Sequence, residues 1–309
     1  MNPGGALRFG AVALMWGSTY FWIKQALGGL SPGQFSFLRV LVGAVAMAAV
    51  VVVAGAVLPR GPGVWLRLLL IGFLTNALPV LLVQVVPDAT GADVGVVSVF
   101  NASVPLWVLL LAPLAREPRT TARLAAGVLV GFAGILLVFP PWEQADRWLT
   151  WGSLVNFVAA VAYGVAMVAM RRLMVAAEVS PLVLSATQAF FGVGWAALAI
   201  PYQGWGAAPE WSTPVVVSLL VLGVLNTAVV FTFFTRLVLD EGALRAGTVL
   251  YLVPIVLVLG SAWLEGTPVT TVQVIGMAVA VVGVVIARLP GARSAPVTPA
   301  AQPEPTAIR

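Results

Sequence analysis

The sequence predicts an all-α polytopic membrane protein, and two observations carry this prediction. Of its 309 residues, 61% are apolar and only 9% are charged, and the mean hydropathy is +1.03. A soluble domain has about 25% charged and about 45–50% apolar residues, so this composition excludes a water-soluble globule. A bilayer-spanning helix needs about 20 residues, and the chain is long enough for about ten such helices joined by short loops.

Apolar stretches separated by glycine, proline or charged residues define ten predicted transmembrane helices. They cover residues 8–28, 34–57, 64–86, 92–114, 121–140, 151–172, 182–201, 214–236, 243–264 and 270–288. The first apolar run continues past Lys24 and lacks a convincing cleavage site, so we expect a retained span and not a signal peptide. After Arg288 the composition becomes rich in proline and polar residues, which predicts a disordered cytoplasmic tail over residues 289–309.

The basic residues indicate the orientation. If the N-terminus is cytoplasmic, most of the 16 basic residues fall on the cytoplasmic side. These are Arg8, Arg60, Arg67, Arg116, Arg119, Arg123, Arg171, Arg172, Arg236, Arg245, Arg288, Arg293 and Arg309. Arg147 falls outside, while Lys24 and Arg39 lie within the outer ends of their helices. The positive-inside rule therefore predicts an N-in, C-in topology, and the net charge of +5 reflects topology and not nucleic-acid binding.

The residues that are missing restrict the chemistry. The chain has no histidine and no cysteine, so it cannot supply a Ser-His or Cys-His nucleophile pair, a thiolate metal site or an axial haem histidine. The sequence thus predicts that the protein is not an enzyme and uses neither a metal nor a cofactor. A non-transporting intramembrane enzyme or a receptor is the alternative from a different class.

The second half of the chain repeats the first at an offset of about 149 residues. Trp16-Gly17 recurs as Tyr163-Gly164, Ser31-Pro32 as Ser180-Pro181, Arg39 as Gln188, Thr75-Asn76 as Asn226-Thr227, and Pro105 as Pro254. Each half, 8–140 and 151–288, holds five predicted helices, so the second half must enter the membrane in the opposite orientation. Inverted repeats of this kind are typical of secondary transporters, whose substrate site lies near the midplane at the repeat interface.

The repeated residues also resemble a known family, the EamA family of the drug/metabolite transporter superfamily. The resemblance rests on Trp16-Gly17-Ser18, Ser31-Pro32 followed by Arg39, Pro105 with Glu117, and the glycine-rich helix 121–140, with the pattern repeated in the second half. It covers about residues 8–288 and implies two EamA repeats, a multi-pass protein of the cytoplasmic membrane, and export of small metabolites such as amino acids. Two departures are Gln188 in place of an arginine and Tyr163 in place of the opening tryptophan.

Polar and aromatic side chains recur at mid-membrane depth in both halves and form the predicted substrate site. Its members are Trp16, Asn76, Ser98, Asn101, Tyr163, Asn226, Thr227 and Tyr251. Amides at this depth cannot face lipid cheaply, so we expect them to point into the bundle or a wet cavity. Pro105 and Pro254 are predicted helix breaks that free backbone carbonyls at the same depth. The alternative is that these groups only bond and pack between helices.

The distribution of charge narrows the substrate. No aspartate or glutamate lies in the central third of a predicted helix, so a cationic drug lacks a counter-ion. Lys24 is the only lysine, which disfavours phosphorylated substrates. The prediction is a secondary transporter that exports small neutral or zwitterionic metabolites, such as amino acids or related apolar or aromatic compounds, by alternating access. Efflux of amphiphilic compounds is the alternative, and the energy source stays open.

Three charged residues near the predicted outer surface form a candidate gate or structural pair: Lys24, Arg39 and Asp93. One of the two cations would meet a substrate carboxylate, or pair with Asp88 or Asp93; the alternative for Lys24 is snorkelling to the interface. Small residues four apart in helices 121–140 and 270–288 permit close helix contact, either within the chain or between two copies. The expected partners are thus a small molecule and the lipid bilayer, while monomer and homodimer both remain open.

Overall fold

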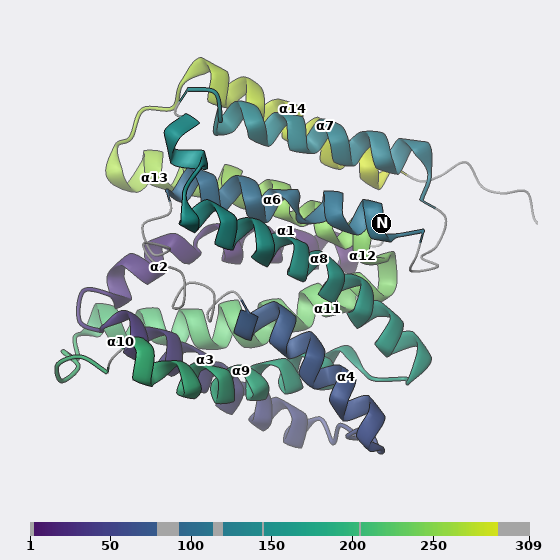
Figure 1. Cartoon of the computed structure of the whole chain (residues 1–309), viewed down its shortest axis with the longest axis vertical. Helices are drawn as coiled ribbons and strands as arrows, with labels where there is room; N and C mark the ends of the chain where they lie inside the picture. Colours follow the sequence, from purple (N-terminus) through teal and green to yellow (C-terminus); the bar gives the residue numbers. More distant parts are fainter. Residues whose placement is uncertain (1–2, 79–92, 114–119, 144, 204, 290–309) are drawn as a thin grey trace, which may run out of the picture.

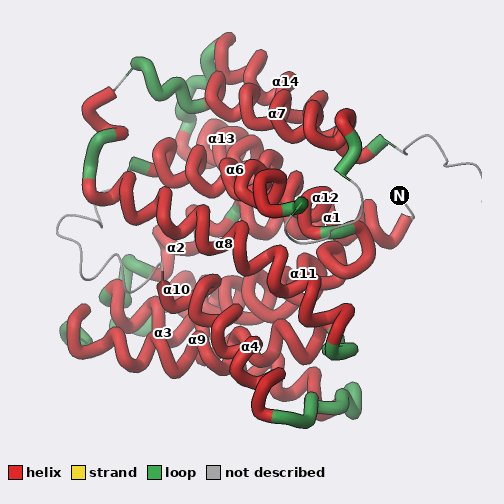
Figure 2. The backbone as a smooth tube through the Cα atoms, turned by 45° about the vertical axis from the view of Figure 1, so that its right-hand side comes forward, coloured by secondary structure: helices red, strands yellow, loops and turns green. Residues whose placement is uncertain are grey.

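The computed structural model describes residues 3–78, 93–113, 120–143, 145–203 and 205–289, and every regular element in these ranges is a helix (Figures 1 and 2). Seven helices are long and apolar enough to span a membrane, namely Pro32–Val53, Val94–Leu111, Trp151–Ala176, Pro181–Leu198, Thr213–Glu241, Ala243–Glu265 and Thr271–Arg288. Shorter apolar helices occupy 62–76 and 122–138. The all-helical, membrane-spanning class is therefore confirmed, while ten spans and the N-in, C-in orientation stay predictions.

The first half of the chain forms one series of helices. These are α1 (Pro3–Gly17), α2 (Thr19–Ala26), α3 (Pro32–Val53), α4 (Pro62–Gly72), the π-helix η1 (Phe73–Ala77), α6 (Val94–Leu111) and α7 (Ala122–Val138). The predicted helix 8–28 is broken at Ser18, where the hydroxyls of Ser18 and Thr19 donate to the carbonyl of Met15. The later part of the predicted helix 64–86, from residue 79, lies outside the described residues.

The second half forms a matching series with more interruptions. It contains the 3₁₀ turn η3 (Ala145–Trp148), α8 (Trp151–Ala176), α9 (Pro181–Gln203), α10 (Thr213–Leu220), the π-helix η4 (Val221–Val229), α11 (Val230–Glu241), α12 (Ala243–Gly247), the 3₁₀ turn η5 (Thr248–Tyr251), α13 (Leu252–Glu265) and α14 (Thr271–Arg288). The predicted helices 214–236 and 243–264 are therefore each built from three segments. The predicted tail lies outside the described residues, apart from Leu289.

Hydroxyl and carboxylate side chains set where several helices begin. Ser31 accepts from the backbone N–H of Gln34 while the Gln34 side chain accepts from Ser31, a reciprocal cap at the start of α3. Thr270 and Gln273 make the same cap on α14. The Asp93 carboxylate accepts from Gly95 N–H at 2.8 Å and starts α6. These caps satisfy N–H groups that have no partner inside the helix.

The last helices of the two halves, α7 and α14, lie side by side along their length (Figures 1 and 2). Glycines make this approach possible: a Cβ added at Gly134 would lie 2.6 Å from the carbonyl oxygen of Gly276. One added at Gly127 would lie 2.7 Å from the carbonyl oxygen of Gly283. The stripes of small residues thus serve a helix contact within the chain, because only small residues let two backbones come this close.

The two halves also interlock through equivalent glycines near the repeated aromatic residues. A Cβ added at Gly17 on α1 would lie 2.5 Å from Val256 Cγ1 on α13. At the equivalent position on α8, a Cβ added at Gly164 would lie 2.6 Å from Trp107 Cβ on α6. Each half therefore packs a glycine against a helix of the other half, and the interface between the halves follows the internal repeat.

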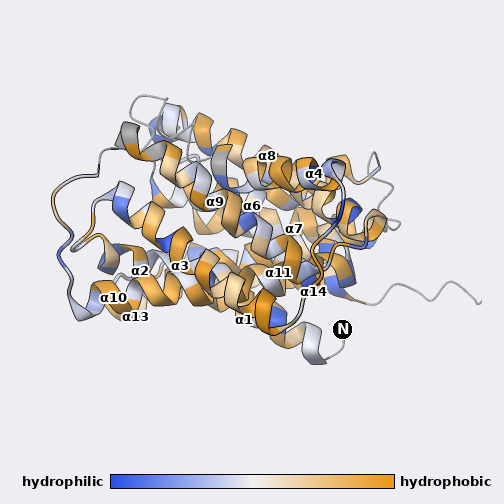
Figure 3. Ribbon diagram, turned by 90° about the horizontal axis from the view of Figure 1, so that it is seen from below, coloured by the Kyte–Doolittle hydropathy of each residue, from blue (hydrophilic) through white to orange (hydrophobic). Residues whose placement is uncertain are grey.

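Ion pairs lie at the helix ends, while apolar residues dominate the helix interiors (Figure 3). At the end of the bundle that carries the N-terminus, Arg8 contacts Asp240 at 3.2 Å and Arg288 contacts Glu241 at 2.6 Å. Charged pairs confined to the ends of apolar helices are the arrangement that a bilayer favours, because a charge at its centre is costly.

Candidate functional site

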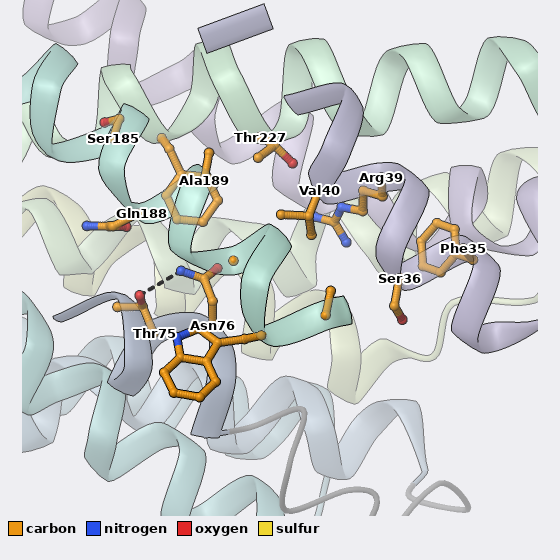
Figure 4. Close-up of a pocket in the computed structure, with 14 residues that line it drawn as sticks. Phe35, Ser36, Arg39, Val40, Thr75, Asn76, Ser185, Gln188, Ala189 and Thr227 are labelled. Carbon is orange, nitrogen blue, oxygen red and sulfur yellow. Dashed lines mark hydrogen bonds between the residues drawn. The ribbon is translucent and has the colours of Figure 1, made fainter. Parts of the chain in front are cut away.

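A cavity of about 310 Å³ lies between the two halves of the chain (Figure 4). Helices α3 and η1 supply one side, and α9 with the η4–α11 helix supplies the other. It is lined by Phe35, Ser36, Arg39, Val40, Thr75, Asn76, Ser185, Gln188, Ala189, Gly192, Trp195, Ala196, Thr227 and Phe231. Small-molecule pockets measure about 300–1,000 Å³, so this cavity suits a small ligand.

Equivalent residues of the two repeats face each other around this cavity. The pairs are Ser36 with Ser185, Arg39 with Gln188, Val40 with Ala189, and Asn76 with Thr227. Because α3 and α9 occupy the same place in their repeats, polar groups approach the cavity from both halves. The cavity thus has the location expected for a substrate site at the interface of an inverted repeat.

Two π-helical segments carry the repeated polar pairs, of which Thr75, Asn76 and Thr227 line the cavity. Thr75 and Asn76 lie in η1, and Asn226 and Thr227 lie at the equivalent place in η4. The Asn76 Nδ2 donates to Thr75 Oγ1 at 2.9 Å (Figure 4), and the Thr227 hydroxyl donates to the Leu222 carbonyl at 2.9 Å. The π-helix is rare and appears frequently at functional sites. Its occurrence in both repeats therefore also indicates a functional site in this region.

Glycines on α3 and α9 hold these π-helical segments close to the opposite half. A Cβ added at Gly43 on α3 would lie 2.7 Å from Thr227 Cγ2. At the equivalent position on α9, a Cβ added at Gly192 would lie 4.0 Å from the Asn76 Cβ and 2.9 Å from Val40 Cγ1. Each π-helical segment therefore contacts the other repeat through a residue without a side chain, which fixes the width of the cavity.

Arg39 is the only charged residue that lines the cavity within the described part of the chain. Its side chain projects from α3 toward the cavity (Figure 4). Among the described residues it makes neither an ion pair nor a hydrogen bond. A cation held among apolar helices without a counter-ion is costly, so a ligand that brings a negative group would relieve that cost.

Two more polar atoms at the cavity lack a hydrogen-bond partner among the described residues: Gln188 Oε1 and Trp195 Nε1. Gln188 is only 1% exposed, and its Nε2 donates to Met170 Sδ at 3.4 Å, which leaves the carbonyl oxygen as an acceptor. An unsatisfied buried polar atom costs about 1–3 kcal/mol. The cavity therefore combines a cation, an N–H donor and an acceptor, each able to gain a bond from a ligand.

An aromatic cluster continues the cavity wall. The rings of Trp16 and Phe234 have centroids 4.9 Å apart, and Tyr163 stacks on the same Phe234 at 6.4 Å. Phe231, which lines the cavity, contacts Trp16 at 5.9 Å. The equivalent aromatic residues Trp16 and Tyr163 thus meet at one buried phenylalanine beside the cavity, although neither lines it.

The structure separates the predicted substrate residues into those at the cavity and those elsewhere. Asn76 and Thr227 line it. The other four predicted polar residues do not line it. Asn226 and Tyr251 are fully buried: Asn226 Nδ2 donates to Thr19 Oγ1 at 2.9 Å, and the Tyr251 hydroxyl donates to the Val128 carbonyl at 2.9 Å. Ser98 is buried in α6, and Asn101 is exposed. Asn226 and Tyr251 therefore make bonds between helices, which was the alternative reading of midplane polar groups.

Lys24 does not pair with Asp93, which was one of the alternatives for Lys24 or Arg39. Lys24 Nζ contacts Glu265 Oε1 at 2.7 Å, because α2 and α13 end at the same end of the bundle. Asp93 contacts Arg147 at 2.9 Å on the turn that precedes α8. The other predicted partner, Asp88, lies outside the described residues.

The two prolines behave differently from each other. Helix α6 runs through Pro105 without a break, so the predicted break there is wrong. The Pro105 ring lies near Gly247. In the second half, the 3₁₀ turn η5 ends three residues before Pro254. Pro254 has no backbone N–H, so the backbone hydrogen bond that would continue the α-helix from η5 into α13 is missing.

Several cavity residues were not recognised from the sequence as site residues. Ser36, Thr75, Ser185, Gln188, Trp195 and Phe231 belong to this group. Gln188 was noted only as a departure from Arg39, and its repeat position was the signal that could have identified it. Ser36 and Ser185 are likewise separated by the repeat offset, but serine is too common in helices for this match to stand out alone.

The fold and the cavity define the class: a polytopic helical membrane protein in which two repeats of one chain enclose a small polar site. The model of the EamA-like transporter family matches residues 4–139 and 150–289, one match for each half. The chain therefore belongs to the EamA-like transporter family. This confirms the resemblance seen in the repeated motifs.

Solved structures share this architecture. One of them, titled only "Crystal structure of protein", is 19% identical, with 93% of this chain and 98% of that chain covered and a TM-score of 0.75. At this identity the likeness shows a common fold and carries no information on substrate. No curated protein matches the chain in sequence.

Proposed function

We propose that this chain is a secondary transporter that binds a small zwitterionic or neutral metabolite in the cavity between its repeats. The observation that carries the proposal is Arg39, a cation at a polar cavity with no acidic partner among the described residues. A carboxylate is the group that arginine holds best, through two parallel charge-assisted hydrogen bonds. The substrate class that fits is an amino acid or a related carboxylate with an apolar or aromatic part.

The remaining groups of the cavity complement such a molecule. Gln188 Oε1 accepts from the ammonium group of the zwitterion, and Trp195 Nε1 donates a further bond to an oxygen. The apolar part packs against the rings of Phe35 and Phe231, which line the same cavity. A few placed polar groups among apolar walls are the usual composition of a small-molecule site.

Cationic amphiphiles fit this cavity less well. Among the described residues, no lining residue is acidic, so a bound cation would meet no counter-ion among them and would be repelled by Arg39. The efflux of amphiphilic compounds is therefore the second candidate, and it is restricted to neutral or anionic ones.

The arrangement of the two halves supports alternating access as the proposed transport mechanism. Helices of the first half are joined to helices of the second by Lys24–Glu265 at one end and by Arg8–Asp240 at the other. In a rocking cycle one end opens while the other stays closed, so each exposed ion pair breaks and re-forms at low cost. The direction we propose, by analogy with the family, is export across the cell membrane.

Flux into liposomes tests the proposal. The purified full chain is reconstituted and uptake of labelled neutral amino acids, including aromatic and branched ones, is measured with and without an imposed pH gradient. We expect saturable flux that empty liposomes lack and that an unlabelled substrate competes away. Transport of a cationic amphiphile alone, with every zwitterion silent, would overturn the proposed substrate class, and no flux of any compound would overturn transport itself.

A further inference from the structure

A second hollow lies between α4 and α8. Figure 1 shows the start of α4 and the end of α8 at the end of the bundle that carries the N-terminus. Its volume is about 690 Å³, and it shares no lining residue with the cavity between the repeats. It is lined by Arg67, Leu70, Ile71, Leu74, Ala169, Arg171, Arg172, Leu173, Val175 and Ala176. We call this hollow the α4–α8 groove.

The α4–α8 groove has two chemically distinct parts. Arg67 comes from α4, and Arg171 and Arg172 come from the last turns of α8, so cations of two helices converge at one place. In the part of the chain that the structure describes, no lining residue is acidic, and all lining residues other than these arginines are apolar. Charge of one sign at the end of an apolar groove is the pattern that complements an amphiphile with an anionic head.

The apolar part opens toward the surroundings of the bundle. Leu70 and Val175 are 52% and 59% exposed, whereas Ile71 and Leu173 are only 3% exposed and form the floor. Leu74 lies seven residues beyond Arg67, about 10 Å along a helix. That length accommodates the first part of an acyl chain below a headgroup.

We propose that the α4–α8 groove binds an anionic phospholipid, with its phosphate at the arginines and an acyl chain along Leu70 and Leu74. Guanidinium groups bind phosphate oxygens through paired hydrogen bonds, and basic pockets between transmembrane helices at the cytoplasmic side bind anionic headgroups. A soluble phosphate would use the arginines and leave the apolar floor without a role. A lipid uses both parts, which is why the groove favours it.

Lipid binding to the purified full chain in detergent tests this proposal, with native mass spectrometry or a lipid titration as readout. The probes are phosphatidylglycerol, phosphatidylcholine with the same acyl chains, and glycerol 3-phosphate as the soluble headgroup. We expect phosphatidylglycerol to bind at least about fivefold more tightly than phosphatidylcholine, because one arginine near a membrane surface contributes about that factor. Equal binding of the two lipids, or equal binding of glycerol 3-phosphate, would overturn the proposal.

Arginine variants locate the lipid. Arg67→Gln and Arg172→Gln each weaken phosphatidylglycerol binding about fivefold and leave phosphatidylcholine unchanged. Both side chains are exposed. The matched control is Arg60, which is also exposed, directly precedes α4 and does not line the groove. Arg60→Gln is expected to bind phosphatidylglycerol like the parent protein. Equal losses in all three variants would show nonspecific surface attraction and overturn the site.

Discussion

Arg39 and Gln188 face one cavity from equivalent positions of the two repeats, the first as a cation and the second as a neutral amide. The neighbouring pairs differ less in chemistry: Ser36 lies opposite Ser185, and Asn76 lies opposite Thr227. The paired positions of the cavity therefore differ most in charge. A ligand with one anionic end binds such a site in one orientation, because only the Arg39 side offers a cation.

Replacement of Arg39 by glutamine makes the two repeats alike at this position. We expect Arg39→Gln to raise the KM for a zwitterionic amino acid about 10- to 100-fold, because a hydrogen bond to a charged group contributes about 1.5–3 kcal/mol. Flux of the corresponding uncharged amide analogue should change little. Liposome uptake of both compounds measures the difference, with Arg60→Gln as the control; an equal loss for both compounds would contradict a carboxylate at Arg39.

Gln188 is expected to recognise the other end of the zwitterion. Gln188→Leu removes the acceptor Oε1 at similar size, so we expect binding of an amino acid to weaken about fivefold. A carboxylate analogue that lacks the amino group should bind as before. Competition against a labelled substrate measures both affinities.

A neighbour on the same helix supplies the control for Gln188. Thr187 is buried, does not line the cavity, and its hydroxyl donates to the Leu184 carbonyl at 2.9 Å. Thr187→Val should leave the discrimination between the two ligands intact. If Gln188→Leu weakened the deaminated analogue as strongly as the amino acid, its effect would be structural and not recognition of an ammonium group.

The glycine that contacts the π-helical segment η4 tests how tightly the cavity wall is built. A Cβ at Gly43 would lie 2.7 Å from Thr227 Cγ2 and 3.0 Å from the Gly223 carbonyl oxygen, so Gly43→Ala should overpack this contact. We expect a loss of about 1–3 kcal/mol in stability, seen as a lower thermal midpoint in detergent. Gly194→Ala on α9 is the control, since a Cβ there meets nothing within 4 Å. Adding Thr227→Ser should recover part of the loss.

The repeat and the family could be predicted from the sequence, because both depend on order and spacing along the chain. Sequence reasoning also located Asn76 and Thr227 at the cavity, since a polar pair recurs there in both halves. It could not predict the π-helical geometry of η1 and η4, which requires one residue more per turn and leaves no composition signal. The break at Ser18 was missed for a similar reason, because Ser and Thr are tolerated inside helices.

The direction in which each side chain points was the harder problem. In a membrane helix the lipid-facing and protein-facing sides are both apolar, so periodicity does not separate them. Asn101 and Ser98 illustrate this: the first is exposed and the second buried, although both are predicted members of the substrate site. The partner of Lys24 was likewise unpredictable, because which helix ends meet depends on the packing of α2 against the second half and not on distance along the sequence.

The Lys24–Glu265 contact provides a test of alternating access. The chain has no cysteine, so the Lys24→Cys/Glu265→Cys variant carries only two thiols, at positions whose longer native side chains meet with Nζ 2.7 Å from Oε1. A short bifunctional thiol reagent would tie α2 to α13. If this end must open in each cycle, we expect crosslinking to lower flux at least about tenfold, and a cleavable reagent to restore it on cleavage.

A pair within one helix distinguishes gating from damage by the reagent. Arg236 and Asp240 contact each other at 3.0 Å on α11, one turn apart. Crosslinking Arg236→Cys/Asp240→Cys joins no two helices. Because this variant also loses the Arg8–Asp240 contact, its flux is compared with itself before and after the reagent, and the two should be the same. Single-thiol variants at positions 24 and 265 should also be insensitive to it. Full flux after complete crosslinking of positions 24 and 265 would mean that this end does not open, and the transport cycle would have to use a different path from the cavity.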